Sequence, residues 1–502
     1  MKLPKYLVTL LSAILFVALF FEKSLGMNVA IYGICTIALL AIFKTEFFKP
    51  MLHKVVSLGF LLTTVFYYLY ASPFTLFVAF LSFLLLIGLH TSSSFRNLLL
   101  AIPNSFVNYF AAYSDFFESF RGRKKHKLNL GLGRILRIIT LPLFIVLLFI
   151  AMYSVGSTFF SEVIGDFFSM FDDLFTKIAK YIDIAAVFVG VLGLLFGVLH
   201  SLGFRTTSLS ELDSKQSDIL SRVRSNIRRR FKTMDLSLEY KSGLFLLSTL
   251  SLLLAILLFG EIKNIWFNFE WGGELLKELV HEGTYVLIVA ILISMAVTMY
   301  YFRKNLNFYK SNKPLKTLAY IWIVLNALLV VSVLVRNIYY IQFFGLAYKR
   351  IGVMFFLALC VVGLLTIFIK ISKVKSSFFV TRVNAFAAYV TLVVICFVNW
   401  DGVIAKYNFS HYKTSFVHLP FMSNLSDKTL PYLRLSDTEM EEIESKQVET
   451  IPFAKRGYFK DVDYQNKIEH RIEKFKEAQE ERHWLESVWA EDKAIELLKV
   501  GE

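Results

Sequence analysis

The sequence predicts an all-α fold, a polytopic transmembrane helical bundle of about eleven spans with a cytoplasmic N-terminus and a small, mostly helical extracytoplasmic C-terminal domain. Three observations lead to this prediction. Hydrophobic residues make up 56% of the 502 residues, whereas charged residues make up only 19%, against roughly 25% in soluble domains. Apolar runs of membrane-spanning length recur through the first 400 residues, and the last hundred are rich in charge.

The apolar runs follow one another along most of the chain. A helix of about 20 apolar residues crosses a hydrocarbon layer roughly 30 Å thick. The first run follows Lys2 and Lys5 like a signal sequence, but Glu22 and Lys23 replace a cleavage site, so we expect a retained anchor. The eleven expected spans lie near 6–21, 27–43, 53–71, 73–90, 136–158, 183–203, 243–260, 284–302, 317–336, 351–370 and 383–399.

Loop charge gives the expected orientation. Basic residues follow the even-numbered spans, while the loops after spans five and seven are acidic. Because Lys and Arg concentrate in cytoplasmic loops, this pattern places the N-terminus in the cytoplasm and the C-terminus outside it. One loop departs from the pattern, because Arg336, Lys349 and Arg350 would face outward with no acid between them. The basic loop residues include Lys44, Lys49, Lys54, Arg121, Arg123, Lys124, Arg228, Arg229, Arg230, Arg303, Lys304, Lys370 and Lys373.

The charge distribution also divides the chain. Residues 401–502 hold 15 Lys and Arg against 20 Asp and Glu, and the preceding 400 hold 39 against 19. We expect an N-terminal transmembrane region at 1–240, a C-terminal transmembrane region at 241–400 and an extracytoplasmic soluble tail domain at 401–502. The basic excess lies in the membrane part, where it orients spans, so we expect no nucleic acid partner. The three cysteines lie within apolar runs and predict no disulfide framework.

Several segments outside the spans have helical periodicity. Residues 95–120, 160–181 and 208–230 read as interfacial helices, the last with a capping box of Ser208 and Glu211. In the tail, Ser436 and Glu439 predict a capping box before a short acidic helix. A longer charged helix with Ile468, Ile472 and Phe475 on one face follows and could continue to Trp489.

Motifs for catalysis or cofactor binding are absent from the sequence. No apolar run has Asp, Glu, Lys or Arg in its central half, which argues against a proton-coupled carrier or a voltage sensor. His281-Glu282 lacks the second histidine of a zinc protease, because position 285 is Tyr. Asn326, within span nine, predicts an interhelical hydrogen bond in preference to a substrate contact. We therefore expect no cofactor and no bound metal, and we rank enzymatic activity behind the non-enzymatic functions.

Polar residues gather where spans eight to eleven meet the outer side. Three cations and a histidine at this boundary could hold a phosphate or carboxylate by forked hydrogen bonds. Alternatively, these charges pair with Glu282, Asp401 and the acidic tail, and so hold the tail against the membrane part. A metal site of His281, Glu282, His411 and His418 is a third hypothesis. The candidate site comprises His281, Glu282, Thr284, Arg336, Asn337, Tyr348, Lys349, Arg350, Asn399 and Asp401.

The same residues carry a resemblance. HEGT (281–284), LAYIWI (318–323), VRNIYYI (335–341), YKRIGV (348–353), RVNAFAAY (382–389) and VNWD (398–401) resemble an uncharacterised family of bacterial multi-pass membrane proteins, known as a domain of unknown function. The resemblance runs over roughly 279–408. It implies a bacterial origin and brings no established activity.

Three functions are compatible with the sequence. The first is a non-enzymatic inner-membrane component of a bacterial cell-envelope complex with an assembly, export or scaffold role. Its partners would be membrane lipids and other membrane or periplasmic proteins. The second is a transporter or lipid-handling protein whose outward polar cluster binds an anion or a headgroup. The third is an enzyme acting on a lipid headgroup, with His281 or Glu282 as the base.

Overall fold

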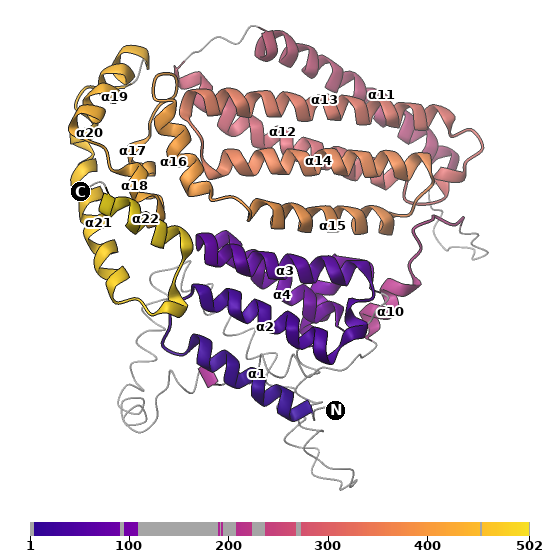
Figure 1. Cartoon of the computed structure of the whole chain (residues 1–502). Coiled ribbons are helices and arrows are strands. Elements are labelled where there is room, and N and C mark those ends of the chain that lie inside the picture. Colours follow the sequence, from indigo (N-terminus) through magenta and orange to yellow (C-terminus); the bar gives the residue numbers. More distant parts are fainter. Residues whose placement is uncertain are drawn as a thin grey trace, which may run out of the picture. The chain divides into compact units, whose positions relative to one another are not determined.

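The structure is a computed structural model that describes residues 5–90, 95–108, 189–190, 192–193, 207–222, 236–267, 273–451 and 454–500 (Figure 1). Within these ranges the regular structure is helical, apart from one isolated antiparallel bridge between Ile219 and Lys375. Helix α1 (Lys5–Phe20) belongs to one compact unit. The other elements described below belong to a second unit.

The second unit contains two groups of apolar helices. The first group is α2 (Met27–Phe43), α3 (Met51–Tyr70) and α4 (Pro73–Leu89), in which α3 packs on both neighbours. The second group is α11 (Leu236–Glu261), which continues as the π-helix η2 (Ile262–Phe267), then α12 (Gly273–Tyr301), α13 (Lys313–Phe344), α14 (Tyr348–Ser372) and α15 (Ser377–Ile395). In this group α13 is central and packs on α11, α12 and α14.

Helices occupy nine of the eleven predicted spans. Six described helices are long and apolar enough to cross a membrane, and they lie at Met51–Tyr70, Leu236–Phe267, Thr284–Tyr301, Lys313–Phe344, Tyr348–Ser372 and Ser377–Ile395. The apolar helices α1, α2 and α4 are shorter than 18 residues. The predicted spans at 136–158 and 183–203 lie almost wholly outside the described residues. The described part of the chain is therefore helical, the protein is of the multi-pass membrane type, and the count of eleven spans is not confirmed.

Helix α15 joins the two groups. The Tyr389 hydroxyl has two acceptors for its one hydrogen, Ser82 Oγ at 3.0 Å and the Val56 carbonyl at 3.3 Å, and Phe397 packs on Phe66 with ring centroids 4.3 Å apart. A Cβ at position 59 would lie 2.2 Å from the Tyr389 hydroxyl. Glycine is therefore required where α3 approaches this side chain.

The residues after α15 form short helices that pack into one apolar cluster. This cluster includes Ile404, Leu430, Ile468 and Phe475 of the tail, and also Ile351 of α14. The tail therefore shares its core with the end of a membrane-type helix. Its elements are α16 (Trp400–Ser410), α17 (Leu419–Met422), η4 (Asp427–Thr429), α18 (Leu430–Leu433), α19 (Asp437–Thr450), α20 (Tyr458–Asp461), α21 (Tyr464–Glu480), η5 (Trp484–Glu486) and α22 (Trp489–Val500).

The local predictions for the soluble segments have mixed outcomes. The capping box of Ser436 and Glu439 is confirmed at the start of α19. The charged helix α21 ends at Glu480, so its continuation to Trp489 is wrong. The capping box predicted at Ser208 lies one residue earlier, at Thr207 with Ser210, and its helix α10 (Ser208–Lys215) ends well before Arg230.

Helix α10 ends early because the following residues pair with the α14–α15 connection. The Ser376 backbone donates to the Asp218 carbonyl at 2.9 Å, and Leu220 donates to the Val374 carbonyl at 3.1 Å. Asp218 also binds Arg382 at 2.7 Å. Of the predicted interfacial segment 95–120, residues 98–108 form a helix and 109–120 lie outside the described residues, as does the segment 160–181.

The tail lies at one end of the helices, and the described basic loops lie at the other. The tail adjoins the C-terminal ends of α3, α13 and α15 and the N-terminal ends of α2 and α14 (Figure 1). The connections at the opposite end carry a series of cations: Lys44, Lys49, Arg303, Lys304, Lys310, Lys373 and Lys375. The described basic loops and the tail therefore lie at opposite ends of the helices.

Candidate functional site

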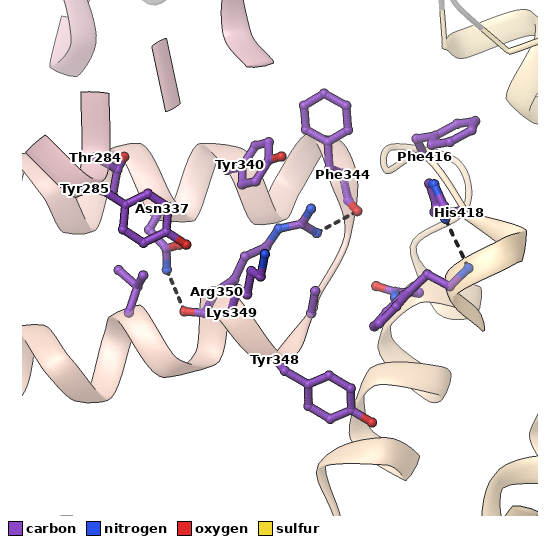
Figure 2. A pocket seen from close by; sticks show the side chains of 14 residues that line it. Thr284, Tyr285, Asn337, Tyr340, Phe344, Tyr348, Lys349, Arg350, Phe416 and His418 are labelled. Atoms are coloured by element: carbon purple, nitrogen blue, oxygen red, sulfur yellow. Dashed lines mark hydrogen bonds between the residues drawn. The ribbon is translucent and has the colours of Figure 1, made fainter. Parts of the chain in front are cut away.

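A cavity of about 570 Å³ lies where α12, α13 and α14 meet the tail (Figure 2). Membrane-type helices contribute Thr284 and Tyr285 from α12, Asn337, Tyr340 and Phe344 from α13, and Tyr348, Lys349, Arg350 and Val353 from α14. Ala347 lies in the connection before α14, and the tail contributes Asn408, Phe416, His418 and Phe421. The volume lies within the range of small-molecule sites, roughly 300–1,000 Å³.

The tight connection from α13 to α14 shapes one wall of the cavity. Gly345 has a φ of +76°, and a Cβ there would lie 2.4 Å from Asn408 Oδ1. Asn408 holds the next residue, Leu346, because its Oδ1 accepts from that backbone N–H at 2.6 Å and its Nδ2 donates to that carbonyl at 3.0 Å. A tail side chain therefore fixes the path of the membrane-side loop.

Arg350 lies in the middle of the cavity lining (Figure 2). Its Nη1 donates to the carbonyls of Phe344, at 2.8 Å, and of Gly345, and its guanidinium lies 4.3 Å from the Tyr340 ring centroid (Figure 2). The last carbonyls of a helix carry partial negative charge. Arg350 therefore offsets the negative end of α13, which accounts for a cation on this side of the protein with no acid among the described lining residues.

The first turn of α14 also faces the cavity. Ala347, the residue before this helix, has no side chain that could cap it. The N-terminal end of a helix presents unpaired N–H groups and partial positive charge, which favours anions. Lys349, in the same turn, is exposed and adds a full positive charge. Among the fourteen described lining residues two are cationic and none is acidic.

Two buried polar side chains complete this wall. Asn337 is 3% exposed, and its Nδ2 donates to the Arg350 carbonyl at 3.0 Å. Thr284 is 4% exposed, and its Oγ1 has no hydrogen-bond partner in the protein. A buried hydroxyl without a partner costs about 1–3 kcal/mol. Thr284 lines the cavity, but this oxygen is closed to solvent, so a ligand would reach it only after the side chain rotates.

The structure divides the residues that the sequence assigned to one cluster. Thr284, Asn337, Tyr348, Lys349 and Arg350 line the cavity. Arg336, Asn399 and Asp401 do not line it. His281 and Glu282 lie in α12, and their side chains lie outside the described residues.

Arg336 has a partner that the sequence did not predict. Its guanidinium binds the Glu261 carboxylate on α11 in a bidentate pair, with Nε 2.9 Å from Oε2. Ser332 Oγ donates to the same carboxylate oxygen at 2.6 Å. Both charged side chains are largely buried, so the pair links α11 to α13 and leaves the cavity without this cation. The predicted pairing with Glu282 stays a prediction, because the side chain of Glu282 lies outside the described residues, and Glu261, at the end of span seven, was not considered.

Asn399 and Asp401 act at the start of the tail. Asn399 caps α16, because its Oδ1 accepts from the Gly402 N–H at 3.3 Å. Asp401 accepts hydrogen bonds from the hydroxyls of Tyr348 and Ser426 and binds Lys428 at 2.7 Å. Figure 2 shows Tyr348 directed away from Arg350, toward the tail. Tyr348 therefore connects the cavity to this second polar group.

The ionisation of Asp401 is set by opposing effects. Burial raises the pKa of its carboxyl, but the Lys428 ammonium and the hydrogen bonds from Lys428, Ser426 and Tyr348 outweigh burial and lower that pKa below its usual range. Lys428 also donates to the Tyr70 carbonyl at 2.6 Å, at the C-terminus of α3. The group therefore ties α3, α14 and the tail together.

The histidines of the metal hypothesis have other contacts. His418 Nδ1 accepts from the Phe421 N–H at 3.1 Å and so caps α17. His411 stacks on Tyr407 with ring centroids 4.1 Å apart. Among the residues whose side chains are described, no three His, Cys, Asp or Glu residues lie close enough to hold a metal ion.

Several lining residues had no signal in the sequence. Tyr285, Tyr340 and Phe344 read as ordinary residues of apolar runs, and Phe416 and Phe421 lie in a tail loop. Gly345, between two apolar runs, was the one local sign of a tight turn. The Asn326 amide N–H donates to the Trp322 carbonyl of its own helix at 2.8 Å. The prediction that this group bonds to another helix is therefore wrong.

Comparison with known proteins supports the resemblance and widens it. The family match includes the first group of helices and the start of the tail, well beyond 279–408. No curated protein and no solved structure matched the chain. The family model for a domain of unknown function (DUF4153) matches residues 7–435, and the chain belongs to that family.

Proposed function

We propose that the protein is a non-enzymatic, lipid-handling or transport protein of the bacterial inner membrane that binds an anionic ligand, a phosphate- or carboxylate-bearing headgroup, in this cavity. The observation that supports this proposal is the composition of the cavity lining. It combines Arg350, Lys349 and the N-terminal end of α14 with the unpartnered Thr284 hydroxyl and contains no described acidic residue. These groups are donors or positive charges that complement an anion.

The orientation is part of the proposal. The described basic loops lie at the end of the helices opposite to the tail, and such loops face the cytoplasm in membrane proteins. The cavity and the tail are therefore assigned to the extracytoplasmic side. The cations on that side do not oppose this assignment, because Arg336 is paired with Glu261 and Arg350 with backbone carbonyls.

Two substitutions test the anion site. We expect Lys349→Glu to weaken binding at least about tenfold, because it replaces an attractive charge with a repulsive one. Thr284→Val should weaken binding while the melting temperature stays unchanged or rises, because this hydroxyl makes no hydrogen bond within the protein. Binding is measured as the ligand-induced rise in melting temperature with two probes, phosphatidylglycerol and glycerol phosphate.

Matched controls separate the site from general effects. Lys373→Glu makes the same charge change on an exposed lysine just after the opposite end of α14. Ser251→Ala removes another buried hydroxyl without a partner, on α11 and outside the cavity lining. Neither control should alter binding. If neither probe raises the melting temperature of the wild-type protein, the anion site is refuted.

A second candidate is a component of a cell-envelope complex with an assembly, export or scaffold role. The favouring observation is the tail helix α19, whose exposed face is strongly acidic and would fit a basic surface on a membrane or periplasmic partner. Its exposed acids are Asp437, Glu439, Glu441, Glu442 and Glu449. Purification in mild detergent should then retain a stoichiometric partner that the double substitution Glu441→Lys and Glu442→Lys releases. A monodisperse wild-type monomer would contradict this role.

A further inference from the structure

The lining of the cavity is of two kinds. Its cationic and polar residues include Arg350, Lys349, Asn337 and Thr284. Most of the remaining lining is aromatic or aliphatic, from Tyr285, Phe344, Val353, Phe416 and Phe421. A small inorganic anion would satisfy the first set and leave the second in contact with water. An amphiphile satisfies both, because its apolar part removes these rings from water.

The cavity continues into a surface that faces lipid. Tyr285 lines the cavity and is 45% exposed. It begins a face of α12 on which Val289, Leu292 and Ile293 are 52%, 44% and 58% exposed. These positions follow helical spacing, so they share one side of the helix. Exposed aliphatic side chains on a membrane-spanning segment contact acyl chains.

We infer that the ligand of the cavity is an anionic phospholipid, with its headgroup at Arg350, Lys349 and Thr284 and its acyl chains along the exposed face of α12. This inference rests on the proposed anion site and names the source of the anion. The cavity is at the aqueous end of the apolar part of α12, since the charged residues Lys277, Glu278 and Glu282 precede Thr284 in the sequence and an apolar run follows it. A lipid headgroup lies at this depth.

The geometry also assigns different roles to the two sets of residues. Substitutions of the polar lining residues should affect every anion that binds there. Substitutions on the α12 face should affect only a ligand with acyl chains. Val289→Gln makes the lipid-facing surface polar without entering the cavity lining. Val324→Gln is its matched control, because Val324 is 59% exposed on α13 and also lies outside the cavity lining.

The test uses the full chain in detergent micelles and in phosphatidylcholine nanodiscs, with bound lipid counted by native mass spectrometry. Phosphatidylglycerol, phosphatidylcholine and glycerol phosphate are the three probes. We expect phosphatidylglycerol to be retained at one per chain and to resist competition by glycerol phosphate. Lys349→Glu should reduce its retention at least about tenfold, and Val289→Gln should reduce it while Val324→Gln does not.

The alternative outcomes separate this inference from the proposed function. If glycerol phosphate binds as tightly as phosphatidylglycerol and Val289→Gln changes neither, the lipid assignment is overturned and the anion site stands. If phosphatidylcholine is retained equally and Lys349→Glu has no effect, charge plays no part and both proposals fail. A loss of folded protein in Val289→Gln is detected by its melting temperature, and Leu292→Gln on the same face then replaces it.

Discussion

Lys428 and Asp401 form an ion pair that is almost closed to solvent, with the ammonium 2.7 Å from carboxylate Oδ2 and side-chain exposures of 3% and 13%. Lys428 comes from η4 and Asp401 from the first turn of α16, and the lysine also binds the last carbonyl of α3. Because Tyr348 binds the same carboxylate, this pair joins both helix groups to the tail beside the cavity.

The first prediction concerns this ion pair. Asp401→Asn should lower the free energy of unfolding by about 3–5 kcal/mol, because it leaves the Lys428 ammonium buried without a counter-charge. The double substitution Asp401→Asn and Lys428→Met should lower the free energy of unfolding by less than Asp401→Asn alone. Denaturant unfolding in micelles measures both. Equal losses in the single and double variants would mean that the pair itself adds no stability.

The second prediction concerns pH. The pKa of Asp401 is lower in the folded protein than its ordinary value of about 3.9. A depressed acid pKa contributes stability that is present above the ordinary value and lost as pH falls through the folded value. The docking of the tail should therefore be constant from neutral pH to about pH 4 and weaken below it.

Hydrogen exchange of residues 424–433, corrected for the intrinsic pH dependence of exchange, measures this weakening. Asp401→Asn is the control, because it should already exchange rapidly at neutral pH and should lack the acid step. Slow exchange of wild-type protein throughout the acid range would contradict the role of Asp401.

The third prediction separates Arg336 from the cavity. Arg336→Ala should reduce stability by about 3–5 kcal/mol, since it leaves the Glu261 carboxylate largely buried and unpaired with this guanidinium. Glu261→Gln together with Arg336→Met should restore part of the loss. In protein that remains folded, headgroup binding should equal that of the wild type. A selective loss of binding with unchanged stability would place Arg336 in the site.

The fourth prediction concerns the turn between α13 and α14. Gly345→Ala should destabilise the protein by more than about 1 kcal/mol, because alanine disfavours a positive φ and its Cβ would collide with Asn408. Gly352→Ala is the matched control, since it lies within α14 and a Cβ there meets no atom within 4 Å. It should be neutral or stabilise by about 0.5–1 kcal/mol. Equal melting temperatures for both variants would contradict this account of the turn.

Much of the helical architecture could be predicted because it depends on local properties. A run of apolar residues predicts a helix at 317–336 whatever its neighbours are, and α13 covers that range. Polar segments were less predictable. The basic segment from Ser208 has helical character, but α10 ends at Lys215, where the chain pairs with the α14–α15 connection instead.

The candidate site was predicted in part, because the position of a residue along an apolar run is a local property. The positions of Thr284, Asn337 and Arg350 near the ends of apolar runs place them at one depth, and the structure brings them to one cavity. The depth of a residue in the membrane does not determine the direction in which its side chain leaves the helix axis. Arg336 therefore shared the predicted cluster, although its side chain is directed to α11 and Glu261.

By itself, the sequence determined a helical membrane protein, its family and the separation of basic loops from a charged tail, because hydrophobic length and loop charge are properties of short segments. Only the tertiary structure decided that Arg336 pairs with Glu261, that Asp401 pairs with Lys428, and that Thr284 lines a cavity completed by Asn408 of the tail. These relationships depend on how each helix is rotated and which helices are neighbours, and residues far apart in the chain fix both.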